Sequence, residues 1–162
     1  MAGPPTLSRQ AARVVMLDQT GAVLLLSGRD PAVAGAPGFW FVPGGGAHPG
    51  EALEATARRE VYEETGAVLG DLGPVVWRRH ASFAFDGIWY EQSESFFVVR
   101  TEAFVPRPTA LTELEQRFTT GARWWALAQL ASTEEVVYPG RLAALVTEWV
   151  ASEAPERPLT ID

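Results

Sequence analysis

The sequence contains no cysteine, which excludes disulfide bonds and metal sites built from thiolates. Its first residues also lack the basic-then-apolar pattern of a secretory signal, so we expect a cytoplasmic protein. The longest apolar runs, such as residues 21–26 and 95–99, are far shorter than the roughly 20 residues that a membrane helix needs. A soluble protein with no membrane partner is therefore expected.

Lysine is missing as well, so all 13 basic residues are arginine, and they face 20 acidic residues for a net charge of -7. A general nucleic-acid binder normally carries a basic face, and this balance argues against one. An anionic ligand would need something to offset the local negative charge. A metal ion is the simplest candidate.

The 162 residues, 47% of them hydrophobic, suit one globular domain that buries its own core. Residues 1–10 are proline-rich and patternless, and residues 151–162 carry two prolines with no sustained apolar period. We expect both segments to be flexible tails around a domain at residues 11–150.

Strands and helices are expected to interleave within this domain. Short β-branched, aromatic or apolar runs bounded by turn residues predict strands at residues 12–17, 22–26, 39–42, 75–85 and 88–100. Helical patterns cover residues 51–65 and 139–150, and a strand end runs into a short helix at residues 124–130. The sequence therefore predicts an α/β layered domain.

Three carboxylates share one face of the helix expected at residues 51–65. Glu60, Glu63 and Glu64 fall within about a 100° arc of the helical wheel, together with the apolar residues Ala57 and Val61. Like charges beside a packing surface repel and are partly desolvated, and a divalent cation relieves this. Oxygen ligands without His or Cys favour Mg²⁺ or Mn²⁺ over zinc. The alternative is an ordinary solvated helix face.

The context of the helix favours the metal site. Gly44–Gly46 precede it, where glycine lets the backbone approach a ligand, and Glu51 and Arg59 form a spaced pair of opposite charges. Gly45, five residues, Glu51, seven residues and then residues 59–67 together match the Nudix box at its seven fixed charged or glycine positions. Ala67, the last residue, is smaller than the aliphatic residue that is usual there. The chain resembles the Nudix hydrolase family on these residues.

This resemblance implies a Nudix-type α/β/α sandwich with a mixed β-sheet, and Mg²⁺, with Mn²⁺ as a substitute, held against a diphosphate. It implies that Glu60, Glu63 and Glu64 are metal ligands and that Glu64 or Glu60 is the catalytic base, although a carboxylate outside the box serves in some members. Glu115 is the expected further ligand, with an ordinary surface glutamate as the alternative.

Other residues of the box are expected to support this site. Glu51 orients the loop through Arg59, and as a helix N-terminal carboxylate it also fits a purely structural role. Gly45 offers its backbone to metal or substrate. Among the arginines, Arg29 and Arg78 are the candidates for binding substrate phosphates, with Arg79 and Arg100 as alternatives.

The expected function is Mg²⁺-dependent hydrolysis of a diphosphate bond in a nucleoside triphosphate or a nucleoside-diphosphate-linked molecule. The alternative is a catalytically silent Nudix-type domain that senses a ligand or binds a protein. Isoprenoid diphosphate isomerisation usually depends on a cysteine, and the chain has none. Secondary motifs typical of ADP-ribose, dinucleoside polyphosphate or coenzyme A relatives are not found, so the substrate stays open. The oligomeric state also stays open, with a homodimer as one option.

Overall fold

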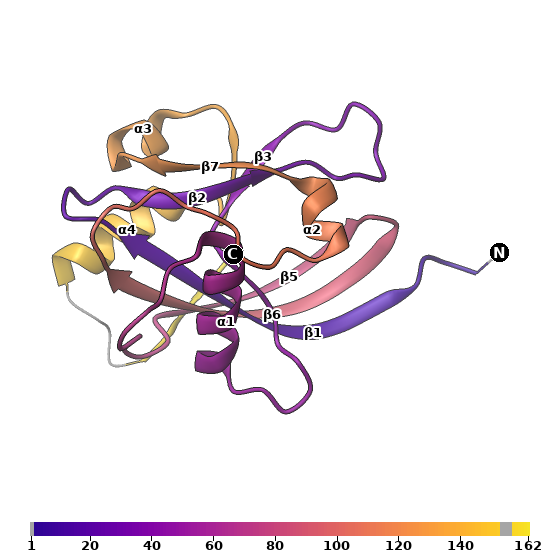
Figure 1. Cartoon of the computed structure of the whole chain (residues 1–162), viewed down its shortest axis with the longest axis horizontal. Helices are drawn as coiled ribbons and strands as arrows, with labels where there is room; N and C mark the ends of the chain where they lie inside the picture. The colour runs from indigo at the N-terminus through magenta and orange to yellow at the C-terminus, as the bar shows by residue number, and fades with distance from the viewer. Residues whose placement is uncertain (1, 153–156) are drawn as a thin grey trace.

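A computed structural model describes residues 2–152 and 157–162 of the chain, and its helices are interspersed among the strands along the sequence (Figure 1). The strands are β1 Thr6–Leu17, β2 Val23–Gly28, β3 Phe39–Phe41, β4 Gly44–Gly46, β5 Trp77–Phe85, β6 Ile88–Arg100, β7 Thr119–Trp125, β8 Val136–Tyr138 and β9 Leu159–Ile161. The helices are α1 Leu53–Thr65, α2 Glu113–Phe118, α3 Leu127–Ser132 and α4 Leu142–Ser152.

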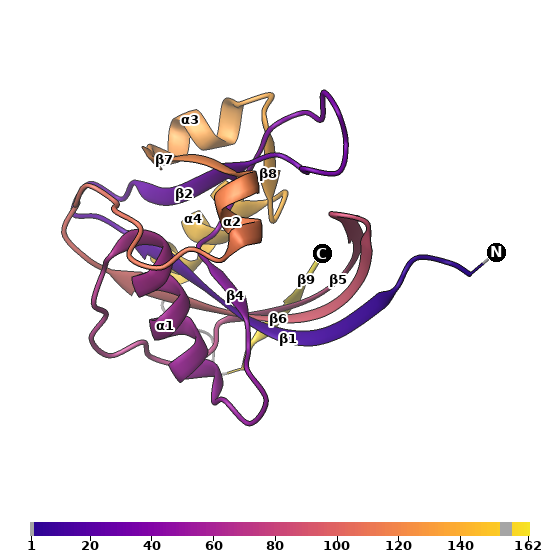
Figure 2. The same cartoon turned by 45° about the vertical axis from the view of Figure 1, so that its right-hand side comes forward.

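The strands form one mixed sheet in the order β8-β3-β2-β1-β6-β5-β9, with β4 paired to β1 and β7 to β2. Strand β1 runs parallel to β6 along its whole length, and β5 is antiparallel to β6. By contrast, β1 meets β2 only at its end, where Leu17 lies opposite Val23, while the earlier residues Ala11–Arg13 pair with β4. The long strands β1, β5 and β6 thus diverge from β2, β3 and β7, and α2 lies between the two groups (Figure 2).

Apolar side chains alternate along β1 and so build a core on each side of the sheet. Val14 packs in the cluster that contains Ala57 and Val61 of α1. Its neighbour Val15 packs in the cluster that contains Leu145 of α4. Because helices cover both faces, the expected α/β/α sandwich with a mixed sheet is confirmed.

The turn and the helix end that the sequence predicted are also found in the structure. Asp86 and Gly87 join β5 to β6 with positive φ angles of 48° and 75°, which suits a tight hairpin turn. Helix α1 ends where Gly66 adopts the left-handed conformation and donates its N–H to the carbonyl of Tyr62. Helix α4 begins at Leu142, three residues later than its pattern suggested.

The expected tails differ from the structure. Thr6 already pairs opposite Trp89, so residues 6–10, expected to be flexible, form the first part of β1, because β6 offers a parallel partner along their length. At the other end, residues 153–156 of the expected tail lie outside the described part of the chain. Leu159–Ile161 pair with β5 as β9.

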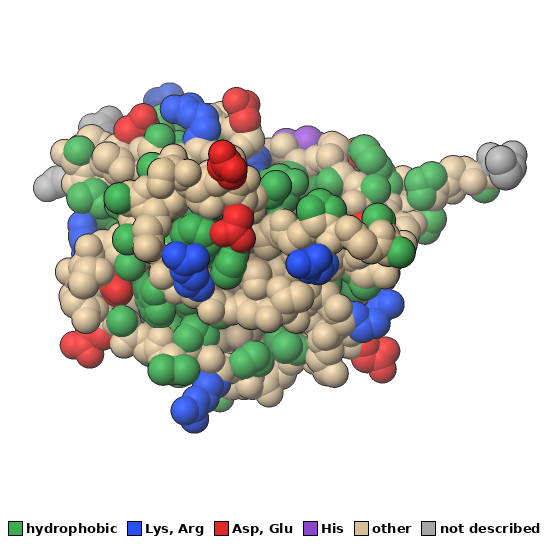
Figure 3. Space-filling view, turned by 90° about the horizontal axis from the view of Figure 1, so that it is seen from above, with side chains coloured by type: hydrophobic (Ala, Val, Ile, Leu, Met, Phe, Trp, Pro, Cys, Tyr) green, Lys and Arg blue, Asp and Glu red, His purple; other side chains and the backbone are tan. Residues whose placement is uncertain are grey.

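The surface carries charges of both signs. On the face shown in Figure 3, arginine and acidic side chains are scattered among apolar and uncharged ones and form no continuous patch of one sign. Within the described residues, no helix has both the length and the apolar character needed to cross a bilayer.

Candidate active site

Three carboxylates from two helices converge at one end of the sheet. Glu60 and Glu64 lie one turn apart on α1 beside its buried apolar stripe, and they are only 8% and 6% exposed. Glu115 approaches from α2, where Thr112 and Glu115 form a capping box. One ligand oxygen from each of these three residues lies within 4.8 Å of the others. Sequence-distant carboxylates therefore meet in a group of the size that a metal ion needs.

The carboxylates of this group are poorly solvated and repel one another. Burial raises the pKa of Glu60, against the opposing effect of Arg59 and with the help of the Glu115 charge. Burial raises the pKa of Glu64 further, and the charge of Glu60 adds to the effect. A cluster that consists of oxygen donors and carries excess negative charge fits a hard divalent cation such as Mg²⁺ or Mn²⁺.

The glycines of β4 allow the backbone to lie against this cluster. Gly44 donates its N–H to Oε2 of Glu64 at 3.0 Å, and its φ of 146° is one that other residues rarely adopt. A Cβ at Gly45 would lie 2.5 Å from the carboxyl carbon of Glu60. Glycine at position 45 therefore brings the chain into direct contact with a carboxylate of the cluster.

Arg59 and Glu51 frame the cluster from the side. Besides its contact with Glu51, Arg59 donates hydrogen bonds to Glu60 at 2.9 Å, to Glu63 at 3.3 Å and to the carbonyl of Gly46 at 3.0 Å. The hydrogen bond from Arg59 is the main reason that the pKa of Glu51 lies far below its usual value. Glu63, expected to be a metal ligand, is paired with Arg59 and does not belong to the group of three convergent carboxylates.

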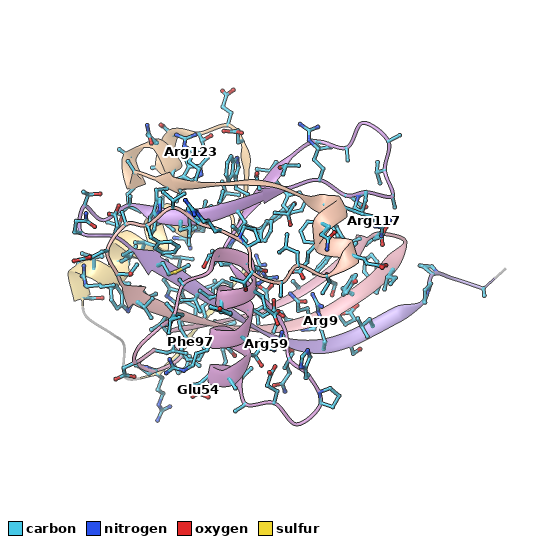
Figure 4. All side chains as sticks on the ribbon, viewed as in Figure 1. Arg9, Glu54, Arg59, Phe97, Arg117 and Arg123 are labelled. Atoms are coloured by element: carbon cyan, nitrogen blue, oxygen red, sulfur yellow. The ribbon has the colours of Figure 1, made fainter. Side chains whose placement is uncertain are left out.

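A cavity of about 1340 Å³ opens beside the carboxylates, between β1, β5 and β6 on one side and β3 and α2 on the other. Acidic, basic and aromatic side chains all contribute to its lining. The acidic ones include Glu60, Glu64, Glu94 and Glu115, the basic ones include Arg9, Arg13 and Arg79, and the aromatic ones include Phe39, Phe41, Phe83, Phe85, Tyr90 and Phe118. Figure 4 shows Arg9 on β1 and Arg59 on α1 near the centre of the molecule. The cavity can therefore hold a ligand that has both phosphates and an aromatic ring.

Arg29 and Arg78, the arginines expected to bind substrate, do not line this cavity. Side chains alternate along β5, so Arg79 faces the cavity while Arg78 is exposed on the other side. Arg29 donates to the carbonyl of Ala36 at 3.0 Å and holds its own loop. Arg100 stacks over Trp149, 5.5 Å from the ring centroid.

Sequence reasoning missed three polar residues of the cavity wall: Arg9, Arg13 and Glu94. Arg9 was missed because the first strand was expected to start at residue 12, which left Arg9 in a tail. Arg13 fell within the expected strand, but without Arg9 no second arginine marked that strand face. The signal that was present is the spacing of Arg9, Ala11 and Arg13, which places them on one face once the strand is extended.

Comparison with known proteins agrees with this arrangement. A nucleoside triphosphatase NudI from Salmonella schwarzengrund (strain CVM19633) is 48% identical over 44 residues, which are 26% of this chain and only 31% of the relative. The solved structure of a MutT protein from Methanosarcina mazei Go1 superposes with a TM-score of 0.63 at 20% identity, covering 96% of this chain and 99% of that one.

The NUDIX domain of Shewanella oneidensis NrtR, solved with ADP ribose, superposes with a TM-score of 0.60 at 18% identity, covering 90% of this chain and 88% of that one. At these identities the solved structures show a shared fold. The family model of the NUDIX domain matches residues 7–145, most of the chain. The chain therefore belongs to the NUDIX family.

Proposed function

We propose that the protein is a Mg²⁺-dependent hydrolase that cuts a diphosphate bond in a nucleoside triphosphate or a nucleoside-diphosphate-linked molecule. The observation that carries the proposal is the convergence of Glu60, Glu64 and Glu115 at the cavity wall, with oxygen atoms within 4.8 Å of one another. Two of these carboxylates are buried without enough positive charge to balance them. Such a cluster is costly unless a cation occupies it.

Glu60, Glu64 and Glu115 would hold the metal. A bound Mg²⁺ neutralises phosphate charge and activates a water molecule for in-line attack on phosphorus. Oε2 of Glu64 is engaged by the Gly44 N–H, which leaves Oε1 of Glu64 for the metal or for the proton of the attacking water. Glu60 is the other candidate base, and its Oε1 already accepts a hydrogen bond from Arg59. Both carboxylates are therefore proposed as catalytic.

The supporting residues keep these oxygens in place. Arg59 joins Glu51, Glu60 and Glu63 in one network and also holds the Gly46 carbonyl, so the glycine strand and the helix cannot move independently. Geometry held in this way lowers the cost of reaching the transition state, because the donors and ligands need little rearrangement.

The rest of the cavity supports a nucleotide-type substrate. Phe83 and Tyr90 stack with their centroids 5.2 Å apart and their planes 11° apart, and they offer an aromatic wall to a base. Arg9, Arg13 and Arg79 line the same cavity and are suited to binding phosphates. The NudI relative is a nucleoside triphosphatase, which favours testing nucleoside triphosphates first.

The test is product release with Mg²⁺ or Mn²⁺ from a panel of nucleoside triphosphates, nucleotide sugars, ADP-ribose, dinucleoside polyphosphates and coenzyme A. Glu64→Gln removes the charge and keeps the side-chain size. Glu54→Gln is the matched control, since Glu54 is exposed and lies in the first turn of the same helix (Figure 4). We expect Glu64→Gln to lose about 10²- to 10⁴-fold in kcat and Glu54→Gln to match the wild type.

The same experiment separates the alternatives. Turnover of one substrate class, lost in Glu64→Gln alone, supports the hydrolase and names its substrate. If the wild type processes no compound of the panel although Mg²⁺ still raises its melting temperature, the hydrolase proposal fails and a ligand-sensing domain takes its place. Equal turnover in both variants would remove Glu64 from the mechanism.

A further inference from the structure

Arg9 is held in place on the cavity wall while its terminal amino groups stay unused. Its Nε donates to Oε1 of Gln92 at 2.6 Å, and its guanidinium lies over the ring of Tyr90, 4.9 Å from the centroid. Among the described residues, neither terminal amino group of Arg9 has a protein hydrogen-bond partner, and no carboxylate forms an ion pair with it. The side chain is thus fixed with its two-nitrogen edge available to a ligand.

A buried chain of hydrogen bonds fixes this orientation. Gln92 is fully buried and donates from Nε2 to Oε1 of Glu94 at 2.6 Å. A carboxylate can only accept here, so the amide of Gln92 must turn its NH₂ toward Glu94 and its oxygen toward Arg9. The rotamer of Gln92, and with it the position of the Arg9 Nε, is therefore set by Glu94.

The charges around Glu94 make Arg9 the unbalanced member of the group. Glu94 forms ion pairs with Arg79 at 2.7 Å and with Arg13 at 3.4 Å, so its single negative charge is shared between two arginines. Arg9 has no such partner, and burial together with the nearby charge of Arg13 lowers its pKa. A half-buried cation next to two others is costly alone and favourable once an anion reaches it.

The glycine strand places this cation close to the acidic cluster. A Cβ at Gly46 would lie 2.9 Å from Cδ and Nη1 of Arg9, whereas a Cβ at the preceding Gly45 would meet the carboxylate of Glu60. Consecutive residues of a strand point to opposite sides, so Arg9 and Glu60 lie on opposite sides of β4. Both side chains nevertheless line the same cavity. A short phosphate chain can reach both.

We propose that Arg9 binds, through its two terminal amino groups, a phosphoryl group of the substrate that the Glu60–Glu64–Glu115 cluster does not hold, and that Gln92 positions Arg9 for this contact. Two N–H groups of a guanidinium edge match two oxygens of one phosphoryl group. The inference rests on the proposed function. It adds that the substrate carries an anionic group on the side of β4 where Arg9 lies, opposite to Glu60.

The test compares Arg9→Gln, Gln92→Met and the double variant with the wild type, and Arg141→Gln is the control, an exposed arginine at the start of α4. The contact between Arg9 and the phosphoryl group would be made equally in the bound substrate and in the transition state. Its loss should therefore raise KM about 10- to 100-fold and change kcat little. Gln92→Met should raise KM by a smaller factor, and adding it to Arg9→Gln should change nothing further. Circular dichroism and thermal melting check that each variant is folded.

A second measurement does not depend on turnover. Calorimetric titration with inorganic tripolyphosphate, in EDTA at low ionic strength, should give at least tenfold weaker binding for Arg9→Gln than for the wild type and for Arg141→Gln. Arg9→Lys serves if Arg9→Gln does not fold; it keeps the charge, loses the Gln92 contact and should lie between wild type and Arg9→Gln.

Equal tripolyphosphate affinity in the wild type and the Arg9 variants, or no binding by the wild type, overturns the inference. So does an unchanged KM in an active enzyme, or a Gln92→Met effect that adds in full to that of Arg9→Gln. These results leave the proposed hydrolase standing. Conversely, a wild type that binds tripolyphosphate through Arg9 but turns over no substrate defeats the proposed function alone.

Discussion

Arg59 donates two hydrogen bonds to the carboxylate of Glu51, from Nε to Oε2 at 2.9 Å and from Nη2 to Oε1 at 2.8 Å. The same carboxylate accepts from the hydroxyl of Thr56 at 2.7 Å and from the backbone N–H of His48 at 3.1 Å. This pair joins the loop before α1 to the middle of the helix. The orientation of the Glu60 carboxylate depends on it, because Arg59 also contacts Glu60.

Glu51→Gln tests this pair. The substitution removes the charge that Arg59 faces, and we expect a loss of about 2 kcal/mol, less than for a fully buried pair because Glu51 and Arg59 are partly exposed. For a chain of this size that corresponds to about 4–8 °C in melting temperature. Thermal unfolding checks it beside Glu54→Gln, for which we expect a change within about 0.5 kcal/mol. A stability equal to wild type would mean that the pair only orients the loop.

Glu64→Gln is expected to stabilise the metal-free protein. Glu64 is buried beside Glu60, and its charge has little compensation without a cation. The neutral amide removes that repulsion and can still accept from Gly44, so the melting temperature in EDTA should rise by about 2–8 °C, or about 1–2 kcal/mol. The increase in melting temperature that Mg²⁺ produces in the wild type should be smaller in Glu64→Gln. A lower melting temperature in EDTA would show that Glu64 is already compensated.

Gly45→Ala tests the close approach of the glycine strand. The added methyl group would lie 2.5 Å from the carboxyl carbon of Glu60, so this carboxylate must leave its present position. We expect Mg²⁺ affinity and turnover to fall about tenfold or more, since displacements of about 1 Å at a site can cost 10²-fold. Gly70→Ala is the control, because its Cβ would meet nothing within 4 Å and its φ is ordinary. Wild-type Mg²⁺ affinity in Gly45→Ala would contradict this account.

The fold was predictable where local chemistry is strong. The hairpin at Asp86 and Gly87, the helix that ends at Gly66 and the layered α/β arrangement all follow from turn residues and periodicity. β4 consists of three glycines and offers no strand pattern, because its pairing with β1 depends on backbone contact alone. The short β8 and β9 form by pairing with β3 and β5, which no local pattern encodes.

The site was predictable from spacing along one helix and less so across elements. Glu60 and Glu64 meet because they are one turn apart, and the spacing alone predicted this. Whether Glu115 joins them depends on how α2 packs, which the sequence only suggested. Arg9 lies 83 residues from Gln92 along the chain, and only the parallel pairing of β1 with β6 brings them together. Long-range pairing of this kind leaves no trace in local periodicity.

The stability of the protein should fall in acid partly through Glu94. Burial alone would raise the pKa of Glu94, but Arg13 and Arg79 outweigh it and hold the pKa below its usual value. Its contribution to stability is therefore complete above the unfolded value of about 4.3 and is lost as pH falls through the lower folded value. Urea unfolding from pH 7 to pH 3 should show this as a steep acid limb in the wild type.

Glu94→Gln should be about 3–5 kcal/mol less stable at pH 7, because it leaves two partly buried arginines without their carboxylate. Below about pH 4 its curve should approach that of the wild type, since protonation removes the same charge. Two curves that stay parallel across the whole range would assign the acid sensitivity to other groups.

Glu115 has two roles that substitutions can separate. Its side chain accepts the N–H of Thr112 at 2.9 Å and its own N–H donates to the Thr112 hydroxyl at 3.2 Å, so it caps α2 while it also faces Glu60 and Glu64. Glu115→Gln keeps an acceptor for the cap and removes the charge, whereas Thr112→Ala breaks the cap and keeps the carboxylate. If Glu115 is a metal ligand, Glu115→Gln should weaken Mg²⁺ binding about tenfold at nearly unchanged stability. Thr112→Ala should cost about 1 kcal/mol of stability and affect Mg²⁺ less. Melting curves with and without Mg²⁺ measure both effects, and a Glu115→Gln protein that binds Mg²⁺ like the wild type would leave Glu115 as a helix cap only.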